Sequence, residues 1–222
     1  MTPRAVLFDC DGVLADTEAM HNRILAQEIT ALGWPMNEAE CERLFIGLSW
    51  QGVIPRIHAQ LGPDSVPAGF IPGIVARVVR ALDEEVTPIP FVLDALRAIV
   101  AAGVPVAVAS NSSAPELAIK LRQLGLVDTF RDRAFTVEDV AQPKPAPDMY
   151  LAAATACGVA PADCVVVEDS VTGTRAGIAA GCRVLGYGHG AHLAALAEAG
   201  AKTFSDMRDL PTLLGLFDAT RP

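Results

Sequence analysis

The sequence lacks the features typical of membrane-spanning and nucleic-acid-binding proteins. No charge-free apolar stretch reaches the roughly 18 residues that a membrane span requires, so we expect none. Positive charge is also scarce, since 17 Lys and Arg stand against 26 Asp and Glu for a net charge of −9. Because nucleic acids and anionic membranes bind basic surfaces, this balance argues against both partners. An anionic ligand would have to be attracted by local charges.

The cysteines form no recognisable redox or metal pattern. The chain has five of them, with no CxxC pair and no even-numbered set for a disulfide framework, which favours a reduced setting. The first residues lead directly into an apolar strand pattern, without the basic and longer apolar segments of a secretory signal. We therefore predict a cytoplasmic protein.

Several familiar binding motifs are missing as well. Residues 186–190 are glycine-rich but do not fit GxGxxG, and no GxxxxGK[ST] occurs, so neither a dinucleotide site nor a P-loop is indicated. The four histidines include no HExxH, which leaves zinc without an evident site. The function must be sought in other patterns.

Three short apolar runs each end in polar residues. Runs of aliphatic residues without alternation are typical of strands buried on both faces of a parallel sheet. In open α/β sheets, ligands bind beyond the carboxyl ends of the strands. We therefore expect these polar residues to meet in one active site. The runs are residues 5–8 before Asp9, 104–109 before Ser110, and 165–167 before Glu168 and Asp169.

The order of these segments predicts an α/β fold, with a Rossmann-like parallel sheet as its core. After about residue 90, strand-like and helix-like segments alternate as in repeated βαβ units. The expected strands cover 104–110, 164–168 and 183–186. The expected helices cover 90–102, 113–125, 148–158 and 172–181, and the second of them begins with a capping box at Ser113.

Residues 16–82 interrupt this alternation. Asp16 or Thr17 can cap a helix that ends at Gly33, and further helical patterns cover 37–45 and 71–82 without a convincing strand. We therefore predict two domains, a Rossmann-like core of residues 1–15 and 83–222 and an all-helical cap of residues 16–82. An insertion directly after the first strand would lie above the site, as a lid does.

The first polar motif contains two carboxylates, Asp9 and Asp11, followed by Gly12. A bend at Gly12 lets both side chains turn toward one ligand. One carboxylate can then attack while the other moves a proton. A calcium loop of the EF-hand type is excluded, because the later oxygen ligands, glycine and glutamate are absent.

In this order, four segments resemble the motifs of the haloacid dehalogenase superfamily. The similarity is to its phosphatase and phosphomutase branch, which has a helical cap after the first strand, and it extends from residue 5 to near residue 190. Such members are hydrolases or mutases of phosphate esters. The four segments are Asp9-Cys10-Asp11-Gly12, Ser110-Asn111, Lys144 between two prolines, and Glu168-Asp169-Ser170.

The resemblance assigns a role to each motif. Asp9 would be the nucleophile that forms an aspartyl-phosphate, and Asp11 would be the general acid and base. The Ser110 hydroxyl and the backbone amide of Asn111 would bind phosphoryl oxygens. Lys144 would offset the charge of the phosphate and of Asp9. The following residues, Ser112 and Ser113, are expected to cap a helix.

The resemblance also implies a magnesium site. Asp9, the backbone carbonyl of Asp11, and Asp169 would supply oxygen ligands, with Glu168 either a further ligand or a partner behind them. Without a cation, several carboxylates in one crevice would repel each other and their pKa values would rise. Asp11 also argues for phosphoryl transfer, because the dehalogenases of the superfamily lack an acid at this position.

The insertion should decide the substrate. Thr17 and His21 resemble hinge positions of β-phosphoglucomutases, but an arginine soon after the cap glycine and a cap lysine, both part of the mutase pattern, are absent. Arg43 and Trp50 flank the turn that supplies specificity in capped relatives, so we expect them at the substrate. Three further arginines of the insertion, Arg23, Arg56 and Arg77, are expected to be solvated helix residues.

These patterns predict a Mg²⁺-dependent phosphatase that acts on a small organic phosphate monoester, such as a sugar phosphate or phosphoglycolate. The alternatives are a sugar phosphate mutase like β-phosphoglucomutase and a relative that binds ligands without turnover. The expected partner is the small-molecule substrate, with neither nucleic acid nor membrane. We expect a monomer or a weak homo-oligomer.

Overall fold

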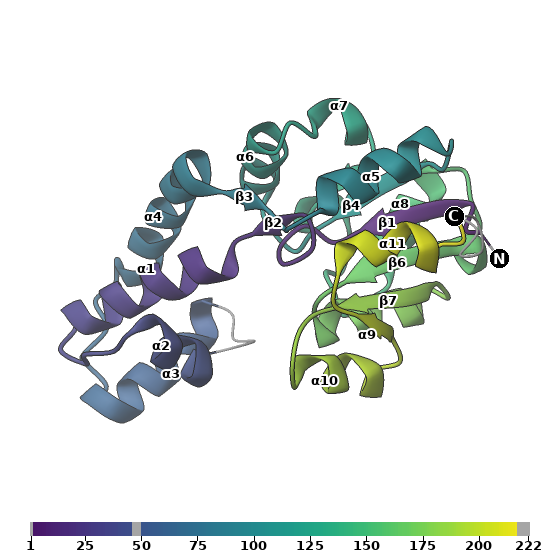
Figure 1. Ribbon diagram of the computed structural model, residues 1–222. Coiled ribbons are helices and arrows are strands. Elements are labelled where there is room, and N and C mark those ends of the chain that lie inside the picture. The colour runs from purple at the N-terminus through teal and green to yellow at the C-terminus, as the bar shows by residue number, and fades with distance from the viewer. Residues whose placement is uncertain (1, 46–49, 217–222) are drawn as a thin grey trace. The chain divides into compact units, whose positions relative to one another are not determined.

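The computed structural model describes residues 2–45 and 50–216, and it leaves the side chains of Trp50 and Gln51 undescribed. The chain divides into two compact units with separate secondary structure (Figure 1). One unit combines Met1–Asp16 with Thr87–Pro222, and the other is Thr17–Val86.

A six-stranded parallel sheet is the centre of the first unit. Its strands are β1 (Ala5–Phe8), β4 (Val106–Ala109), β5 (Ala134–Phe135), β6 (Cys164–Glu168), β7 (Arg183–Tyr187) and β8 (Lys202–Phe204). They lie in the order β5-β4-β1-β6-β7-β8, and every neighbouring pair is parallel. This arrangement confirms the predicted α/β, Rossmann-like fold. The two strands that the sequence did not indicate, β5 and β8, are short edge strands.

Helices connect the strands of this unit. They are α5 (Val92–Ala101), α6 (Ala114–Gln123), α7 (Val127–Phe130), α8 (Asp148–Ala156), α9 (Val171–Ala179), α10 (His192–Glu198) and α11 (Leu210–Leu213). The four predicted helices, α5, α6, α8 and α9, agree with the structure to within two residues at each end. Ser113 and Glu116 form the expected capping box, in which the Ser113 amide donates to the Glu116 carboxylate at 2.9 Å.

Both faces of the sheet are buried, as the unbroken apolar runs indicated. On one face Leu7 and Val166 join a core cluster with Met149 of α8. On the other, Phe8 packs edge-on against Phe130 of α7, with ring centroids 6.4 Å apart. A sheet covered in this way leaves only the strand ends accessible to a ligand.

The second unit contains four helices in the part of the chain that the structure describes. They are α1 (Glu18–Ala31), α2 (Glu38–Phe45), α3 (Trp50–Leu61) and α4 (Phe70–Glu85). The sequence indicated α1, α2 and α4 but not α3, because Pro55 lies inside α3 and proline usually breaks a helix. The burial of Val53 and Ile57, one helical turn apart, offsets that cost.

A short antiparallel ribbon stands at both ends of this insertion. It pairs β2 (Ala15–Asp16) with β3 (Thr87–Pro88), so that Asp16 faces Thr87. Asp16 is therefore a strand residue, and the expectation of no strand in 16–82 is wrong at its first position. Thr17 occupies the N-cap position of α1. None of the helices among the described residues has the length and apolar character needed to cross a membrane.

Candidate active site

Three strands deliver polar residues to the carboxyl edge of the sheet. Asp9 follows β1, Ser110 follows β4, and Glu168 is the last residue of β6. The Asp9 amide donates to the Val167 carbonyl and the Ser110 amide donates to the Phe135 carbonyl, both at 2.9 Å, so the ladder still holds each backbone. All three side chains are buried. The ends of these strands thus hold the three polar residues in position.

A tight loop after Asp9 brings β1 close to the residue that follows β6. The Cys10 carbonyl accepts hydrogen bonds from the amides of Leu14 and Ala15, at 2.8 and 2.9 Å. Gly12 has φ +73°, and a Cβ atom on it would lie 1.9 Å from Oδ2 of Asp169. Only glycine allows both this backbone conformation and this approach.

Lys144 is at the centre of a buried network of polar groups. Its Nζ donates to Oδ1 of Asp9 at 2.6 Å, to Oε1 of Glu168 at 2.7 Å and to the hydroxyl of Tyr150 at 2.9 Å. These bonds use all three ammonium protons. Burial lowers the pKa of Lys144, but Asp9 and Glu168 raise this pKa by more, so the lysine stays charged.

Glu168 is fully buried, and hydrogen bonds fill its acceptor positions. Oε1 accepts from Lys144 and from the Tyr150 hydroxyl at 2.8 Å, while Oε2 accepts from the Ser170 amide at 3.0 Å and its hydroxyl at 2.8 Å. Burial raises the pKa of Glu168, but Lys144 and these donors lower it overall. Four donors match the roughly four lone pairs of a carboxylate, so Glu168 is well placed to hold Lys144.

A second close approach keeps Glu168 in place. Helix α9 begins beside this carboxylate, and a Cβ atom on Gly173 would lie 1.6 Å from its Oε1. The Ser170 hydroxyl, which donates to Glu168, also accepts from the Gly173 amide at 2.9 Å and so caps α9. The start of α9 can therefore lie against the charged group.

Asp9 is the carboxyl group of this network that most readily takes up a proton. The pKa of Asp9 is raised to about 7. Burial is the main cause, the nearby charges of Glu168 and Asp11 add to the shift, and Lys144 opposes it. A bound cation would relieve this repulsion.

Three carboxylates of the site could hold a metal ion. Asp9, Glu168 and Asp169 each offer one oxygen, and these oxygens all lie within 4.8 Å of one another. An oxygen-only set suits a hard divalent cation, and the negative charges of Glu168 and Asp11, which add to the raised pKa of the buried Asp9, favour a cation beside it. The residues present therefore fit a divalent metal.

Asp11 lies in a separate set of contacts. Its carboxylate accepts from Nζ of Lys120 at 2.6 Å (Oδ1) and 2.7 Å (Oδ2), and its Oδ2 accepts from the Ser112 hydroxyl at 2.9 Å. The Ser110 hydroxyl is 3.4 Å from the same Oδ2. Ser110 is thus drawn toward Asp11, and its hydroxyl also accepts from the Ser112 amide at 3.1 Å.

Asn111 uses its side chain to hold the backbone of Lys144. Its amide nitrogen donates to the Lys144 carbonyl at 3.2 Å, and its oxygen accepts from the Lys144 amide at 3.1 Å. The segment after β4 is thereby joined to the loop that carries the lysine. The side chain of Asn111 acts on the site through Lys144.

Sequence reasoning missed three residues that complete these networks: Tyr150, Lys120 and Ser112. Ser112 was expected to cap a helix, but Ser113 does so, and Ser112 instead bonds Asp11. Lys120 could have been found, because it lies on the same helical face as Leu117 and Leu121, where an apolar residue is expected. Nothing in the sequence around Tyr150 distinguishes it from a packing residue.

The residues predicted in the insertion lie in the helical unit. Thr17 is buried at the start of α1, and His21 is half-buried one turn later, where its amide donates to the Thr17 carbonyl at 3.0 Å. Arg43 is exposed in the last turn of α2. Trp50 begins α3, but its side chain, like residues 46–49, lies outside the described part of the chain.

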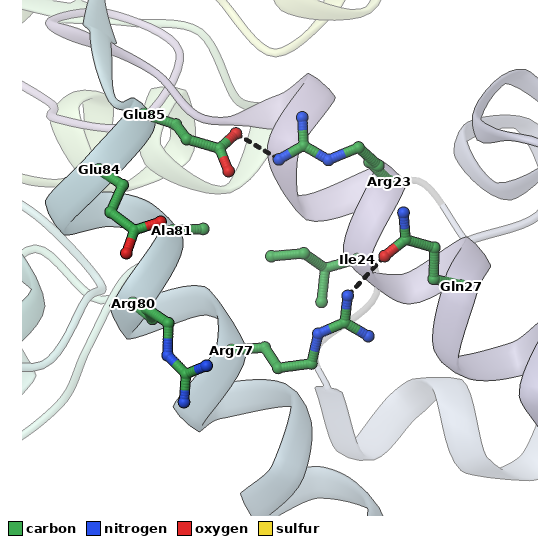
Figure 2. Close-up of a pocket in the computed structure, with 8 residues that line it drawn as sticks. All are labelled: Arg23, Ile24, Gln27, Arg77, Arg80, Ala81, Glu84 and Glu85. Carbon is green, nitrogen blue, oxygen red and sulfur yellow. Dashed lines mark hydrogen bonds and ion pairs between the residues drawn. The ribbon is translucent and has the colours of Figure 1, made fainter.

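The helical unit also contains an open, polar cavity of about 240 Å³ between α1 and α4 (Figure 2). Arg23, Arg77 and Arg80 line it together with Glu84 and Glu85. Arg23 pairs with Glu85, and Arg77 bonds Gln27 on α1 as well as Glu28. Two of its three arginines are therefore engaged within the unit.

Comparisons with known proteins agree with this geometry. Residues 3–181 match the family of haloacid dehalogenase-like hydrolases. The chain is 29% identical to 6-phosphogluconate phosphatase of Escherichia coli over 94% of this chain and 93% of that protein. It is 30% identical to hexitol phosphatase A of Escherichia coli, over 83% of each chain.

A solved structure shows the same likeness in three dimensions. A HAD family hydrolase from Deinococcus radiodurans, crystallised with bound phosphate and sodium, has a TM-score of 0.83 and 34% identity, over 97% of this chain and 98% of that one. The family match and the shared fold agree, and the chain therefore belongs to the haloacid dehalogenase-like hydrolases.

Proposed function

We propose that the protein is a Mg²⁺-dependent phosphatase of small organic phosphate monoesters, acting through a phosphoenzyme on Asp9. The observation that carries this proposal is the position of Asp9. It lies 2.6 Å from the Lys144 ammonium, and one of its oxygens belongs to the carboxylate cluster with Asp169. An ionised Asp9 can attack phosphorus while neighbouring cations offset the charge of a phosphate.

The chemistry divides into two half-reactions. In the first, which begins with Asp11 protonated and Asp9 ionised, an oxygen of Asp9 bonds to phosphorus, the bond from phosphorus to the ester oxygen breaks, and Asp11 gives that oxygen its proton. In the second, Asp11 takes a proton from water as the water oxygen bonds to phosphorus. The bond to Asp9 then breaks, and inorganic phosphate leaves. Asp9 and Asp11 both return to their starting states.

Lys144 is proposed to offset the negative charge of the phosphoryl group during these steps, and Ser110 is proposed to donate a hydrogen bond to one of its oxygens. Lys144 is held by Glu168, Tyr150 and Asn111, so its charge is in place before the substrate arrives. The Ser110 hydroxyl lies at the carboxyl end of the neighbouring strand β4, and the backbone amide of Asn111 is proposed to bind a second phosphoryl oxygen.

Asp9 and Asp169, with the backbone carbonyl of Asp11, are proposed to hold Mg²⁺. The saturated hydrogen bonding of Glu168 favours its role behind Lys144 over direct ligation. When bound, the ion supplies positive charge that stabilises the transferring phosphoryl oxygens.

Hydrolysis is favoured over isomerisation of a sugar phosphate. The names of the curated relatives, 6-phosphogluconate phosphatase and hexitol phosphatase A, describe phosphatases of phosphorylated carbohydrates. We therefore propose phosphorylated sugars and their acid or alcohol derivatives as the substrate class. The unit Thr17–Val86 is proposed as the cap that selects among them, with Thr17, His21, Arg43 and Trp50 as its candidate substrate contacts.

A panel of phosphate monoesters with Mg²⁺ tests this function. Release of inorganic phosphate is expected from the wild-type protein, and Asp9→Asn should abolish it. Asp128→Asn, at an exposed position in α7, is the matched control and should leave turnover unchanged. Activity that survives Asp9→Asn would contradict the nucleophile assignment. Conversion of a hexose 1-phosphate into its 6-phosphate, without phosphate release, would instead identify a mutase.

A further inference from the structure

We propose that Lys120 is a positioning residue, which together with Ser112 fixes the Asp11 carboxyl group for proton transfer. This inference rests on the proposed function, because it gives Lys120 a role only through Asp11.

The directions of the hydrogen bonds follow from the cation. Lys120 can only donate, and its Nζ contacts Oδ1 of Asp11 at 2.6 Å, Oδ2 at 2.7 Å and the Ser112 hydroxyl oxygen at 2.7 Å. The Ser112 hydroxyl accepts this bond and donates its own proton to Oδ2 of Asp11 at 2.9 Å. Two connected donors therefore hold one carboxylate, which fixes its plane as well as its position.

The burial of the two partners differs in a way that suits this role. The Lys120 side chain is 2% exposed, whereas that of Asp11 is 31% exposed. The ammonium thus holds the carboxylate from the protein interior, while part of the carboxylate remains accessible to a reacting group.

Burying the Lys120 ammonium at this position costs free energy, which its ion pair must offset. It lies on the inward face of α6, beside the buried Leu117 and Leu121. Moving an ammonium out of water is unfavourable, and an apolar residue would fill this position without that cost. The contacts of Lys120 with Asp11 and Ser112 are what offset it.

A comparison of two leaving groups separates positioning of Asp11 from general damage. An alkyl oxygen needs a proton as it leaves, whereas a p-nitrophenyl oxygen does not. Lys120→Met should therefore lower kcat/KM about 10- to 100-fold for the best alkyl phosphate of the substrate panel, as for other residues that act through a neighbour. For p-nitrophenyl phosphate the expected fall is about threefold or less. With this ester, a burst of p-nitrophenol should precede slower turnover, because water activation also uses Asp11.

A double-mutant cycle shows whether Lys120 acts through Asp11. Asp11→Asn should show the same preference for the aryl ester, and adding Lys120→Met to it should change kcat/KM for the alkyl ester by about twofold or less. Lys202→Met, at an exposed position in β8, is the matched control and should retain wild-type kinetics. Far-ultraviolet circular dichroism reports whether each variant folds.

Ser112→Ala provides a second test if Lys120→Met does not fold. It keeps the ion pair and removes one donor, so a smaller loss with the same preference for the aryl ester is expected. Equal loss for both esters, no loss, or an additional loss in the Asp11→Asn background would overturn the role of Lys120. The proposed function fails separately, if the wild type hydrolyses neither ester or if Asp9→Asn retains activity.

Discussion

The two units of the protein place their charged side chains in different ways. In the sheet unit, Lys144 and Lys120 are buried, and each is bound by carboxylates that come from distant parts of the chain. In the helical unit, Arg23 and Arg77 lie beside an open cavity and pair with residues of the same helical layer. Buried charges cannot exchange their partners for water, whereas exposed charges can. The charged groups of the sheet unit are thus fixed by their partners, whereas those of the helical unit can exchange their partners for water.

The largest effect should follow removal of the central cation of the sheet unit. Lys144→Met leaves Asp9 and Glu168 buried without their shared partner, and breaking such a pair typically costs about 3–5 kcal/mol. We expect a fall of that size in the free energy of unfolding, measured in urea, and loss of phosphate release. Lys202→Met is the control for loss of a lysine. Unfolding at the wild-type urea concentration would show that the network is not coupled to stability.

A smaller effect, a loss of kcat, is expected where the backbone of Gly12 lies close to the Asp169 side chain. Gly12→Ala places a Cβ atom 1.9 Å from Oδ2 of Asp169 and strains a backbone with φ +73°. Displacement of reacting groups by about 1 Å can cost about 10²-fold in rate, so kcat should fall by that order. Gly33→Ala is a control with similar strain, because its φ is +101° but its Cβ atom would meet nothing within 4 Å. Equal effects of the two substitutions would contradict the importance of the approach.

The affinity of the sheet unit for Mg²⁺ should depend on pH. In the metal-free protein the pKa of Asp9 is raised to about 7, so below that pH a metal must displace its proton. The apparent affinity for Mg²⁺ should therefore fall about tenfold per pH unit below pH 7 and level off above it. Calorimetry in buffers of different ionisation enthalpy would measure the proton released.

The same shift predicts how stability depends on pH. Between pH 3.8, the ordinary pKa of the group, and about 7, the folded metal-free protein holds a proton on Asp9 that the unfolded chain has lost. The contribution of Asp9 to stability is therefore present at low pH and is lost as the pH rises through 7. Asp9→Asn removes this contribution. Metal affinity that stays constant from pH 5.5 to 8 would contradict both predictions.

The smallest effects should come from the helical unit. Arg77→Ala removes an exposed hydrogen bond to Gln27 and a half-buried ion pair with Glu28, and ion pairs that solvent can reach contribute about 0–1 kcal/mol. We expect a change of that size in the free energy of unfolding. Arg43→Ala should leave stability unchanged and raise KM for a doubly anionic substrate. Unchanged kinetics would remove Arg43 from the substrate site, and a large loss of stability in Arg77→Ala would break the contrast between the units.

The sequence was sufficient where local patterns control the structure. The apolar runs before Asp9, Ser110 and Glu168 predicted adjacent parallel strands, and the capping box at Ser113 predicted the start of α6 correctly. These features depend on neighbours along the chain, so composition and spacing reveal them. The meeting of these three strand ends at one edge of the sheet then followed from the rules of α/β sheets, whereas their order did not.

Other features depend on contacts between distant residues, and the sequence did not reveal them. Tyr150 reads as part of an apolar helix face, yet its hydroxyl joins Lys144 to Glu168. Lys120 stands 109 residues from Asp11, and only the fold brings them together. Helix α3 was missed because Pro55 is unfavourable by itself and is outweighed by tertiary packing.

The ribbon of β2 and β3 has a consequence for how this architecture can diversify. Asp16 and Thr87 face each other as paired residues, so the chain leaves the sheet unit and re-enters it at neighbouring points. Any segment whose own ends lie side by side can be spliced there without altering the register of the sheet, and a two-residue turn would simply close the ribbon as a hairpin. The pairing of Asp16 with Thr87 therefore allows the region between them to be exchanged as one segment while the strands of the sheet keep their order.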